Sequence, residues 1–322
     1  MRFLIIGLGS IGRRHFQNLR KLGNKNIAVV RNKKKVDGPQ AEFLKKHKPL
    51  IFYSINEAYK WRPDAVIVAN PTNLHVKTSC LALENNAHVF IEKPLSHNMR
   101  GVNDLIRLAR KKKKIIYVGY HLRHHPQLKK IKKMLDKGII GKIFYARFVT
   151  GEYLPDWHPW ENYRKGYAAR KDLGGGVVLT QSHDLDIAYW FFGKAKVVAS
   201  EVKNSEILKL TVEDFAEILA RFKNCPLVSF HVDYLVRPPV KTLEIYGTKG
   251  RLAWNYHKSE FKINYIAGKE KTDKLIKFER NDMYISELKY FIKCAKYNCK
   301  PATDGMAGKE VLKMAISALK KI

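Results

Sequence analysis

Short apolar runs alternate with amphipathic stretches from residue 1 to about residue 120. The runs are rich in β-branched residues, whereas in the stretches between them apolar residues recur at helical spacing. Such alternation predicts an α/β domain, in which helices connect the strands of a doubly wound parallel sheet. The predicted strands span residues 2–6, 26–30, 65–69, 88–91 and 115–118.

The pattern changes after a predicted helix from Pro126 to about Lys137, which Gly138 ends. Longer alternating segments follow, interrupted by one predicted helix near residues 180–192. They predict a second, α+β domain built on a largely antiparallel mixed sheet. Its strands are expected at residues 143–153, 196–202, 213–222, 227–236, 242–246 and 251–255.

The pattern therefore predicts two domains, 1–120 and 121–322. The segments 282–297 and 306–320 are predicted to be helices, and we expect the second of them to pack back on the first domain.

No apolar run reaches the roughly 20 residues that cross a bilayer, so no membrane partner is expected. Cys80, Cys225, Cys294 and Cys299 lack metal-ligand spacing, which predicts no metal site and favours a reducing, cytoplasmic location.

The formal net charge is +32. The lysines lie along predicted helix faces and at helix ends, and no zinc-finger, basic-zipper or aromatic RNA-binding signature is present. We therefore expect no nucleic-acid partner. Two explanations of the positive charge remain open, an anionic small substrate and a general lysine bias of the proteome.

A glycine turn follows the first predicted strand, with the sequence Gly7-Leu8-Gly9-Ser10-Ile11-Gly12. In a dinucleotide-binding turn the first glycine permits the bend, the second lets backbone approach a pyrophosphate, and the third lets the helix pack closely. A purely structural turn is the alternative. The cofactor interpretation assigns dinucleotide contacts to Gly7, Gly9, Ser10, Ile11 and Gly12.

The second predicted strand ends at Arg31, followed by Asn32 and three lysines. An NAD-specific site commonly carries a carboxylate here for the ribose diol, and this segment has none. Arg31 is therefore predicted to meet the 2′-phosphate of NADP(H), with NAD(H) use also open.

Further segments occur in a specific order. Ala69-Asn70-Pro71-Thr72 is followed by His75, then by Ala87-His88-Val89 leading into Glu92-Lys93-Pro94. Gly119-Tyr120-His121-Leu122-Arg123 comes next, and Gly174-Gly175-Gly176 precedes His183 and Asp186. With the glycine turn, this set resembles the Gfo/Idh/MocA oxidoreductases, which act mostly on sugars, inositols and sugar nucleotides.

The resemblance implies a Rossmann domain followed by a mixed-sheet domain, as the pattern independently predicts. It also implies that the second sheet mediates assembly into a homo-oligomer. Further cofactor contacts would come from Asn70, Pro71, Thr72, His75 and Glu92.

By the same resemblance, Lys93 is the catalytic or substrate-positioning lysine, and its bond to Pro94 is cis. An ammonium after a strand can polarise a hydroxyl or carbonyl and exchange its proton; a lysine that merely ends a strand is the alternative.

His183 is predicted to be catalytic or to hydrogen-bond a substrate hydroxyl, with Thr180 and Asp186 on the same helix face. A buried structural histidine is the alternative, and Asp186 is expected to orient or cap locally. Relatives commonly place an aspartate four residues before this histidine, where this chain has Leu179. A proton relay through that aspartate is therefore in question.

The loop 153–164 combines aromatic and polar side chains and predicts a substrate loop; a connection pinned by its own aromatic cluster is the alternative. The predicted substrate contacts are Tyr120, Arg123, Trp157, Trp160, Arg164 and Thr180. Together these features predict an NADP(H)-dependent oxidoreductase that interconverts a secondary alcohol and a ketone on a carbohydrate, including nucleotide-linked and acidic sugars. An NAD-dependent glycosidase using transient oxidation and a non-catalytic dinucleotide-binding regulator remain alternatives.

Overall fold

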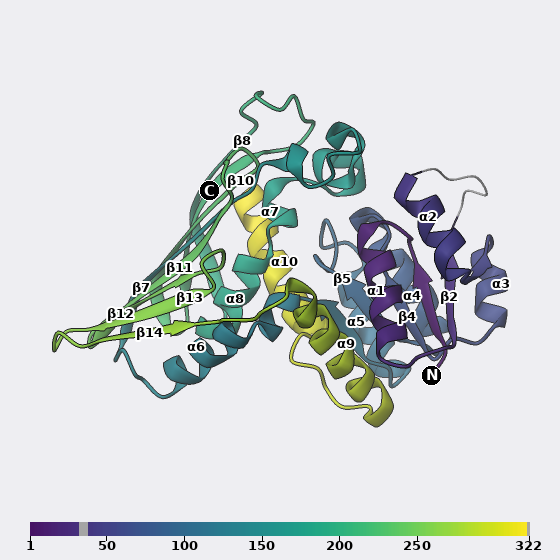
Figure 1. The fold of residues 1–322 in the computed structure, drawn as a ribbon, viewed down its shortest axis with the longest axis horizontal. Coiled ribbons are helices and arrows are strands. Elements are labelled where there is room, and N and C mark those ends of the chain that lie inside the picture. The colour runs from purple at the N-terminus through teal and green to yellow at the C-terminus, as the bar shows by residue number, and fades with distance from the viewer. Residues whose placement is uncertain (32–37, 321–322) are drawn as a thin grey trace. The chain divides into compact units, whose positions relative to one another are not determined.

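The computed structural model describes residues 1–31 and 38–320, and the chain divides into two compact units. The first unit comprises Met1–His121 and Asn281–Lys309, and the second comprises Leu122–Arg280 and Glu310–Ile322. The division after Lys309 falls inside the last helix, α10 (Gly305–Leu319). Figure 1 shows the elements of each unit.

The first unit contains a six-stranded sheet in the order β3-β2-β1-β4-β5-β6, and all neighbouring strands pair in parallel. This confirms the predicted doubly wound sheet. Strand β3 was not predicted, because it has three residues and none of them is buried. The strands are β1 (Phe3–Ile6), β2 (Ile27–Val30), β3 (Leu50–Phe52), β4 (Ala65–Val68), β5 (His88–Glu92) and β6 (Ile116–Gly119).

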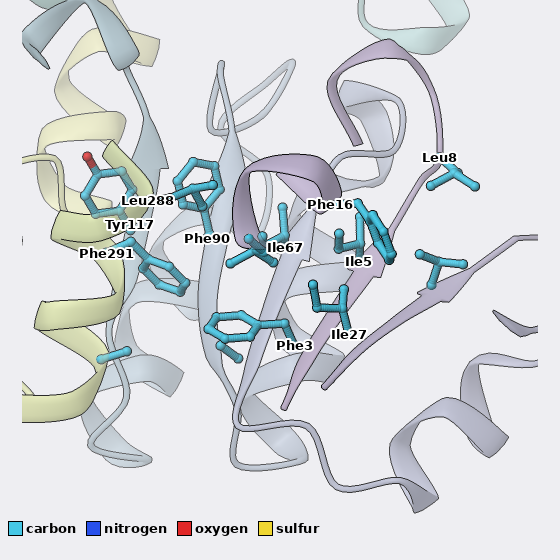
Figure 2. Close-up of a cluster of buried hydrophobic side chains, with 14 of the residues drawn as sticks. Phe3, Ile5, Leu8, Phe16, Ile27, Ile67, Phe90, Tyr117, Leu288 and Phe291 are labelled. Carbon is cyan, nitrogen blue, oxygen red and sulfur yellow. The ribbon is translucent and has the colours of Figure 1, made fainter. Parts of the chain in front are cut away.

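Helices connect these strands, and a helix from far along the sequence joins the same core. Side chains of the sheet, Phe3, Ile5 and Phe90, cluster with Leu288 and Phe291 of helix α9 (Arg280–Tyr297), as Figure 2 shows. Burial of these rings and branched side chains stabilises the sheet that carries the glycine turn. The helices are α1 (Ser10–Lys21), α2 (Gly38–His47), α3 (Ile55–Lys60), η1 (Thr72–Leu74), α4 (His75–Glu84), α5 (Val102–Lys111) and α9 (Arg280–Tyr297).

The second unit contains an eight-stranded sheet in the order β14-β13-β12-β11-β7-β10-β9-β8. Only the pair β7 and β10 is parallel among its described strands, so the predicted mixed, largely antiparallel sheet is confirmed. The strands are β7 (Ile143–Gly151), β8 (Ala195–Lys203), β9 (Phe215–Phe222), β10 (Cys225–Asp233), β11 (Val240–Gly247), β12 (Gly250–Asn255), β13 (Glu260–Tyr265) and β14 (Glu270–Lys274).

The single helix predicted near residues 180–192 is two helices, and that prediction was wrong. Gln181 leaves the helical conformation, with φ −91° and ψ 23°. Thr180 therefore ends one helix and His183 begins the next, so the two do not share one helix face. The helical segments of the unit are η2 (His121–His124), α6 (Pro126–Asp136), η3 (Leu154–Asp156), η4 (Tyr163–Lys165), η5 (Tyr167–Ala169), η6 (Lys171–Leu173), α7 (Val177–Thr180) and α8 (His183–Phe192), with most of α10.

Candidate active site

The three glycines of the turn after β1 have different surroundings. Gly7 has φ +102°, and a Cβ there would lie 2.4 Å from the carbonyl oxygen of Ala69, just after β4. A Cβ on Gly12 would lie 2.0 Å from the carbonyl oxygen of Gly7. Gly9 has an ordinary φ of −69°, and a Cβ there would meet nothing within 4 Å. The first and third glycines are therefore required by packing, whereas the second borders open space.

That open space lies at the N-terminus of α1, where Ser10, Ile11 and Gly12 form the first turn. The first amides of a helix have no intrahelical acceptor and favour a bound anion. The first turn of α1 contains no acidic side chain that would compete for them. The site also lies at the carboxyl edge between β1 and β4, where the strand order reverses direction, as in dinucleotide-binding sheets. The residues present therefore fit a pyrophosphate.

Arg31 follows β2 at the same edge of the sheet and is only 7% exposed. Its Nε and one terminal nitrogen are buried, and neither hydrogen-bonds to a residue that the structure describes. Buried polar groups are nearly always satisfied, so this guanidinium fits an anionic ligand. The predicted run after Arg31, from Asn32 to Lys35, lies outside the described residues.

His75 connects the loops that follow β4 and β5. Its Nε2 lies 2.9 Å from the carbonyl oxygen of Asn70, and its Nδ1 lies 2.9 Å from that of Pro94. Burial lowers the pKa of His75, so the ring favours its neutral form, which donates one hydrogen bond at a time. Asn70 donates a side-chain hydrogen bond to Thr78 at 2.8 Å, and Thr72, after Pro71, is buried at the start of η1. The predicted cofactor segment 70–75 is thus fixed against the loop that carries Lys93.

Glu92 is the last residue of β5, and it pairs with His15 of α1. His15 Nε2 and Glu92 Oε1 are 2.6 Å apart, with both side chains buried. Lys93 follows, and its backbone N–H donates to the other oxygen of Glu92 at 3.3 Å. The Lys93–Pro94 peptide bond is cis. Since β1, β4 and β5 are parallel neighbours, Lys93 and the glycine turn lie at the same edge of one sheet.

The second unit holds the other predicted catalytic residue. His183 is buried at the first position of α8. Thr180 lies beside the hydroxyl of Tyr234, whose pKa burial raises well above its ordinary value. Leu179, where the resemblance implies an aspartate, is also buried. Its apolar side chain can offer His183 no hydrogen bond.

Arg123 and Asp186 form a buried bidentate ion pair. Arg123 Nε and Nη2 donate to the two carboxylate oxygens at 2.8 and 2.7 Å. Burial raises the pKa of Asp186, while the guanidinium acts against that shift. The partner of Asp186 was not predicted, because the two residues are 63 positions apart. Arg123 stays a predicted substrate contact, now with one carboxylate partner identified.

The predicted substrate loop is partly held by contacts with residues outside it. Trp157 packs edge-on against Tyr234, with ring centroids 5.5 Å apart, and Arg164 Nε donates to the carbonyl of Leu208 at 3.1 Å. Trp160 is 58% exposed. Tyr120, by contrast, belongs to the first unit and is fully buried. Contacts of this kind do not distinguish a substrate loop from a structural connection, so the substrate role of the loop stays a prediction.

Glu213 was not predicted as a site residue, and its carboxyl group has a raised pKa. Its carboxylate accepts the backbone N–H of Val178 at 3.2 Å and lies where a Cβ on Gly176 would be. Burial raises the pKa of Glu213 to about 7. No sequence signal distinguishes it from other glutamates, because the shift comes from its surroundings.

No group of histidine, cysteine, aspartate and glutamate side chains in residues 1–31 and 38–320 is arranged to hold a metal ion. Among the helices that the structure describes, none combines the length and apolar character that crossing a membrane requires.

The strand order and the glycine turn define a dinucleotide-binding Rossmann domain joined to a mixed-sheet domain. Residues 1–120 match the model of the oxidoreductase family with an NAD-binding Rossmann fold, and residues 128–253 match the GFO/IDH/MocA C-terminal domain. The chain belongs to the Gfo/Idh/MocA oxidoreductase family, as the resemblance predicted. It is an NAD(P)-binding oxidoreductase.

Relatives match along almost the whole chain. Myo-inositol 2-dehydrogenase of Thermotoga maritima is 30% identical over 100% of this chain and 96% of its own length. A levoglucosan dehydrogenase in complex with NADH and levoglucosan superimposes with a TM-score of 0.86 at 17% identity, covering 99% of this chain and 96% of the other. UDP-N-acetylglucosamine 3-dehydrogenase of Acidithiobacillus ferrooxidans gives a TM-score of 0.80 at 19% identity, covering 99% and 97%. The two structural matches show the shared fold.

Proposed function

We propose that this chain is an NADP(H)-preferring oxidoreductase that interconverts a secondary alcohol and a ketone on a carbohydrate. The observation that carries the proposal is the edge of the first sheet, where an anion-binding helix start, a buried guanidinium and Lys93 follow parallel strands. The relatives named for inositol, levoglucosan and a sugar nucleotide support the substrate class. The net charge of +32 favours an anionic sugar derivative among these.

When bound, the nicotinamide cofactor supplies the hydride acceptor or donor. Gly9 and the first turn of α1 bind the pyrophosphate, and Arg31 binds the 2′-phosphate. The neighbouring loop contributes further cofactor contacts from Asn70, Pro71, Thr72 and His75. Glu92 holds His15 and the backbone of Lys93, and so fixes the position from which the lysine side chain extends.

Lys93 holds and transfers the proton at the reacting oxygen, since an ammonium can donate to a ketone oxygen and an amine can accept from a hydroxyl. His183 serves as a second acid or base, or donates to a substrate hydroxyl. The proposed contacts with the sugar come from Thr180, Tyr120, Arg123, Trp157, Trp160 and Arg164.

A panel of polyols, free sugars, acidic sugars, sugar phosphates and sugar nucleotides tests the proposed reaction. Each compound is mixed with the chain and NADP or NAD, and cofactor reduction is followed by absorbance. We expect stoichiometric reduction with at least one member. Glycoside cleavage without net reduction would replace the proposal by the glycosidase alternative, and cofactor binding without any turnover would replace it by the regulator.

The cofactor preference is tested by Arg31→Asp. A carboxylate at this position repels the 2′-phosphate and accepts from a ribose hydroxyl, so NADP affinity should fall by about tenfold or more while NAD affinity is kept or improved. Calorimetric titration with both cofactors measures this. The control is Arg110→Asp, an exposed arginine of α5 in the same unit. Unchanged NADP affinity in Arg31→Asp would contradict the preference.

We also propose that the chain forms a homo-oligomer through the outer face of its second sheet. On β9 the buried residues alternate with exposed ones, and Leu219 is exposed among the latter. Leu227 of β10 is likewise exposed.

The four cysteines are free, which suits a reducing, cytoplasmic location.

A further inference from the structure

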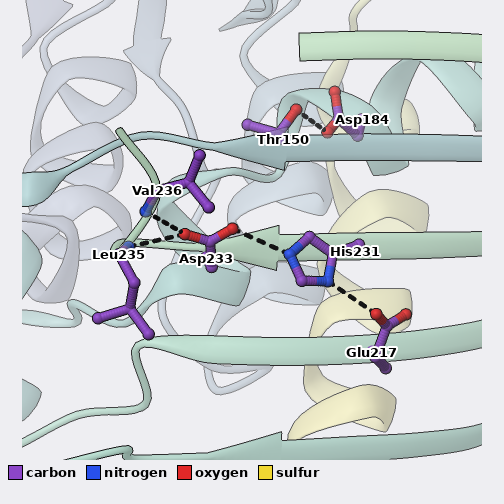
Figure 3. Close-up of polar contacts among 7 residues, drawn as sticks. All are labelled: Thr150, Asp184, Glu217, His231, Asp233, Leu235 and Val236. Carbon is purple, nitrogen blue, oxygen red and sulfur yellow. Dashed lines mark hydrogen bonds and ion pairs between the residues drawn. The ribbon is translucent and has the colours of Figure 1, made fainter. Parts of the chain in front are cut away.

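Three polar side chains meet on the helix-facing side of the second sheet. Lys241 of β11 donates to the hydroxyl of Thr150 on β7, with Nζ and Oγ1 2.9 Å apart. Thr150 in turn donates to Asp184 of α8 at 2.6 Å (Figure 3). Lys241 Nζ also lies 3.3 Å from the other oxygen of Asp184. The three side chains therefore form a closed network of one cation, one anion and one hydroxyl.

This network is buried where an apolar contact would be expected. The side chains of Lys241 and Asp184 are 7% and 4% exposed, and Thr150 is fully buried. On the same face of β11 the next inward residues are Leu243 and Ile245, both fully buried. Removing a lysine and an aspartate from water is costly, and their attraction offsets this only when geometry and hydrogen bonding are good. Such a pair is therefore weak evidence for a gain in stability, and a positioning role has to be considered.

The position of Asp184 indicates what is being held. It is the second residue of α8, directly after His183, which begins the helix. Thr150 and Lys241 are direct cross-strand neighbours on β7 and β11, so the network ties the first turn of α8 to two central strands. Four residues before His183 the chain has Leu179, whose side chain offers no polar group to orient the ring.

We propose that Lys241 is a positioning residue for the reaction, because it holds Asp184 and Thr150 together and so fixes the first turn of α8 and the ring of His183. This inference rests on the proposed role of His183. Lys241 itself needs no contact with substrate.

The other ionisable groups around Lys241 come from the neighbouring segments. Tyr256, after β12, donates its backbone N–H to the carbonyl of Lys241 at 3.0 Å. Burial lowers the pKa of His257, and both Lys241 and Arg280 lower it further, whereas Glu152 opposes them. His257 is thus disfavoured as a second cation, and Lys241 supplies the charge that balances Asp184.

Lys241→Met tests the inference, since it keeps the stem and removes the charge. The buried carboxyl of Asp184 would then be tolerated mainly in its protonated form. We expect kcat to fall by about tenfold at high pH, a loss of about 1.4 kcal/mol in transition-state stabilisation, with a smaller loss at low pH and little change in KM. The double variant Lys241→Met with Asp184→Asn should recover most of kcat and the parental pH profile. Lys133→Met, an exposed lysine of α6 in the same unit, is the control.

A second readout does not depend on turnover. The ring signals of His183, assigned by their loss in His183→Gln, are titrated by NMR in the parent, Lys241→Met and Lys133→Met. We expect a changed titration and broadened signals only in Lys241→Met. An unchanged titration together with an unchanged kcat pH profile would overturn the inference, even if the variant melts at a lower temperature. Full activity of His183→Gln would instead overturn the proposed role of His183.

Discussion

Replacing Lys93 by methionine is expected to lower kcat by a factor of about a hundred to ten thousand, the usual range for loss of a general acid or base. Methionine keeps the length and apolar stem of the side chain but cannot donate or accept the proton at the reacting oxygen. The backbone N–H of Lys93, which donates to Glu92, is retained in this variant. Cofactor affinity should therefore stay close to that of the parent chain.

Steady-state kinetics and calorimetric titration of the purified variant measure the two quantities separately. The matched control is Lys77→Met, an exposed lysine of α4 in the same unit, which should leave both unchanged. Retention of kcat in Lys93→Met, in a sample with normal cofactor affinity, would remove Lys93 from the mechanism. A loss of cofactor affinity equal to the loss in kcat/KM would assign it a binding role.

Alanine at Gly12 and alanine at Gly9 should affect different properties, the first stability and the second cofactor binding. A Cβ on Gly12 would lie 2.0 Å from the carbonyl oxygen of Gly7 and 3.0 Å from its carbon, so rigid backbone would have to move. We expect Gly12→Ala to lower the free energy of unfolding by about 3 kcal/mol, at the upper end of overpacking effects. Gly9→Ala should leave that free energy almost unchanged, since its Cβ would point into open space with ordinary φ.

The open space at Gly9 is where the pyrophosphate is expected, so Gly9→Ala should weaken cofactor binding by at least about tenfold, or 1.4 kcal/mol. Thermal unfolding and calorimetric titration of both variants test the pair of expectations. Normal cofactor affinity in a folded Gly9→Ala sample would mean that the turn is structural only. Normal stability of Gly12→Ala would contradict the close approach of the turn and the helix.

Local sequence patterns were sufficient for the fold of each unit. The strands β1, β2, β4, β5 and β6 are continuously buried and mostly apolar, apart from His88 and Glu92 at the ends of β5, which is typical of parallel sheets. Strand β14 was not predicted, because Glu270–Lys274 is almost entirely charged and pairs along only one edge, to β13. The break between α7 and α8 was missed, because the helical spacing continues through Gln181.

The site was predictable where a motif is local. The spacing of Gly7, Gly9 and Gly12 predicts a backbone shape, and the structure shows which two of them packing requires. The ion pairs of His15 with Glu92 and of Arg123 with Asp186 join residues 77 and 63 positions apart. No periodicity links such partners, since only the packing of α1 on β5, or of η2 on α8, brings them together. The same holds for Lys241 and Asp184.

Isotope transfer tests the central claim most directly. A carbohydrate that supports turnover is labelled with deuterium on its carbinol carbon, and the reduced cofactor and the product are weighed by mass spectrometry. The account predicts one deuterium in each molecule of reduced NADP, a ketone product, and the loss of both in Lys93→Met. Product formed with no deuterium in the free cofactor pool, or deuterium returned to the product after glycoside cleavage, would contradict it.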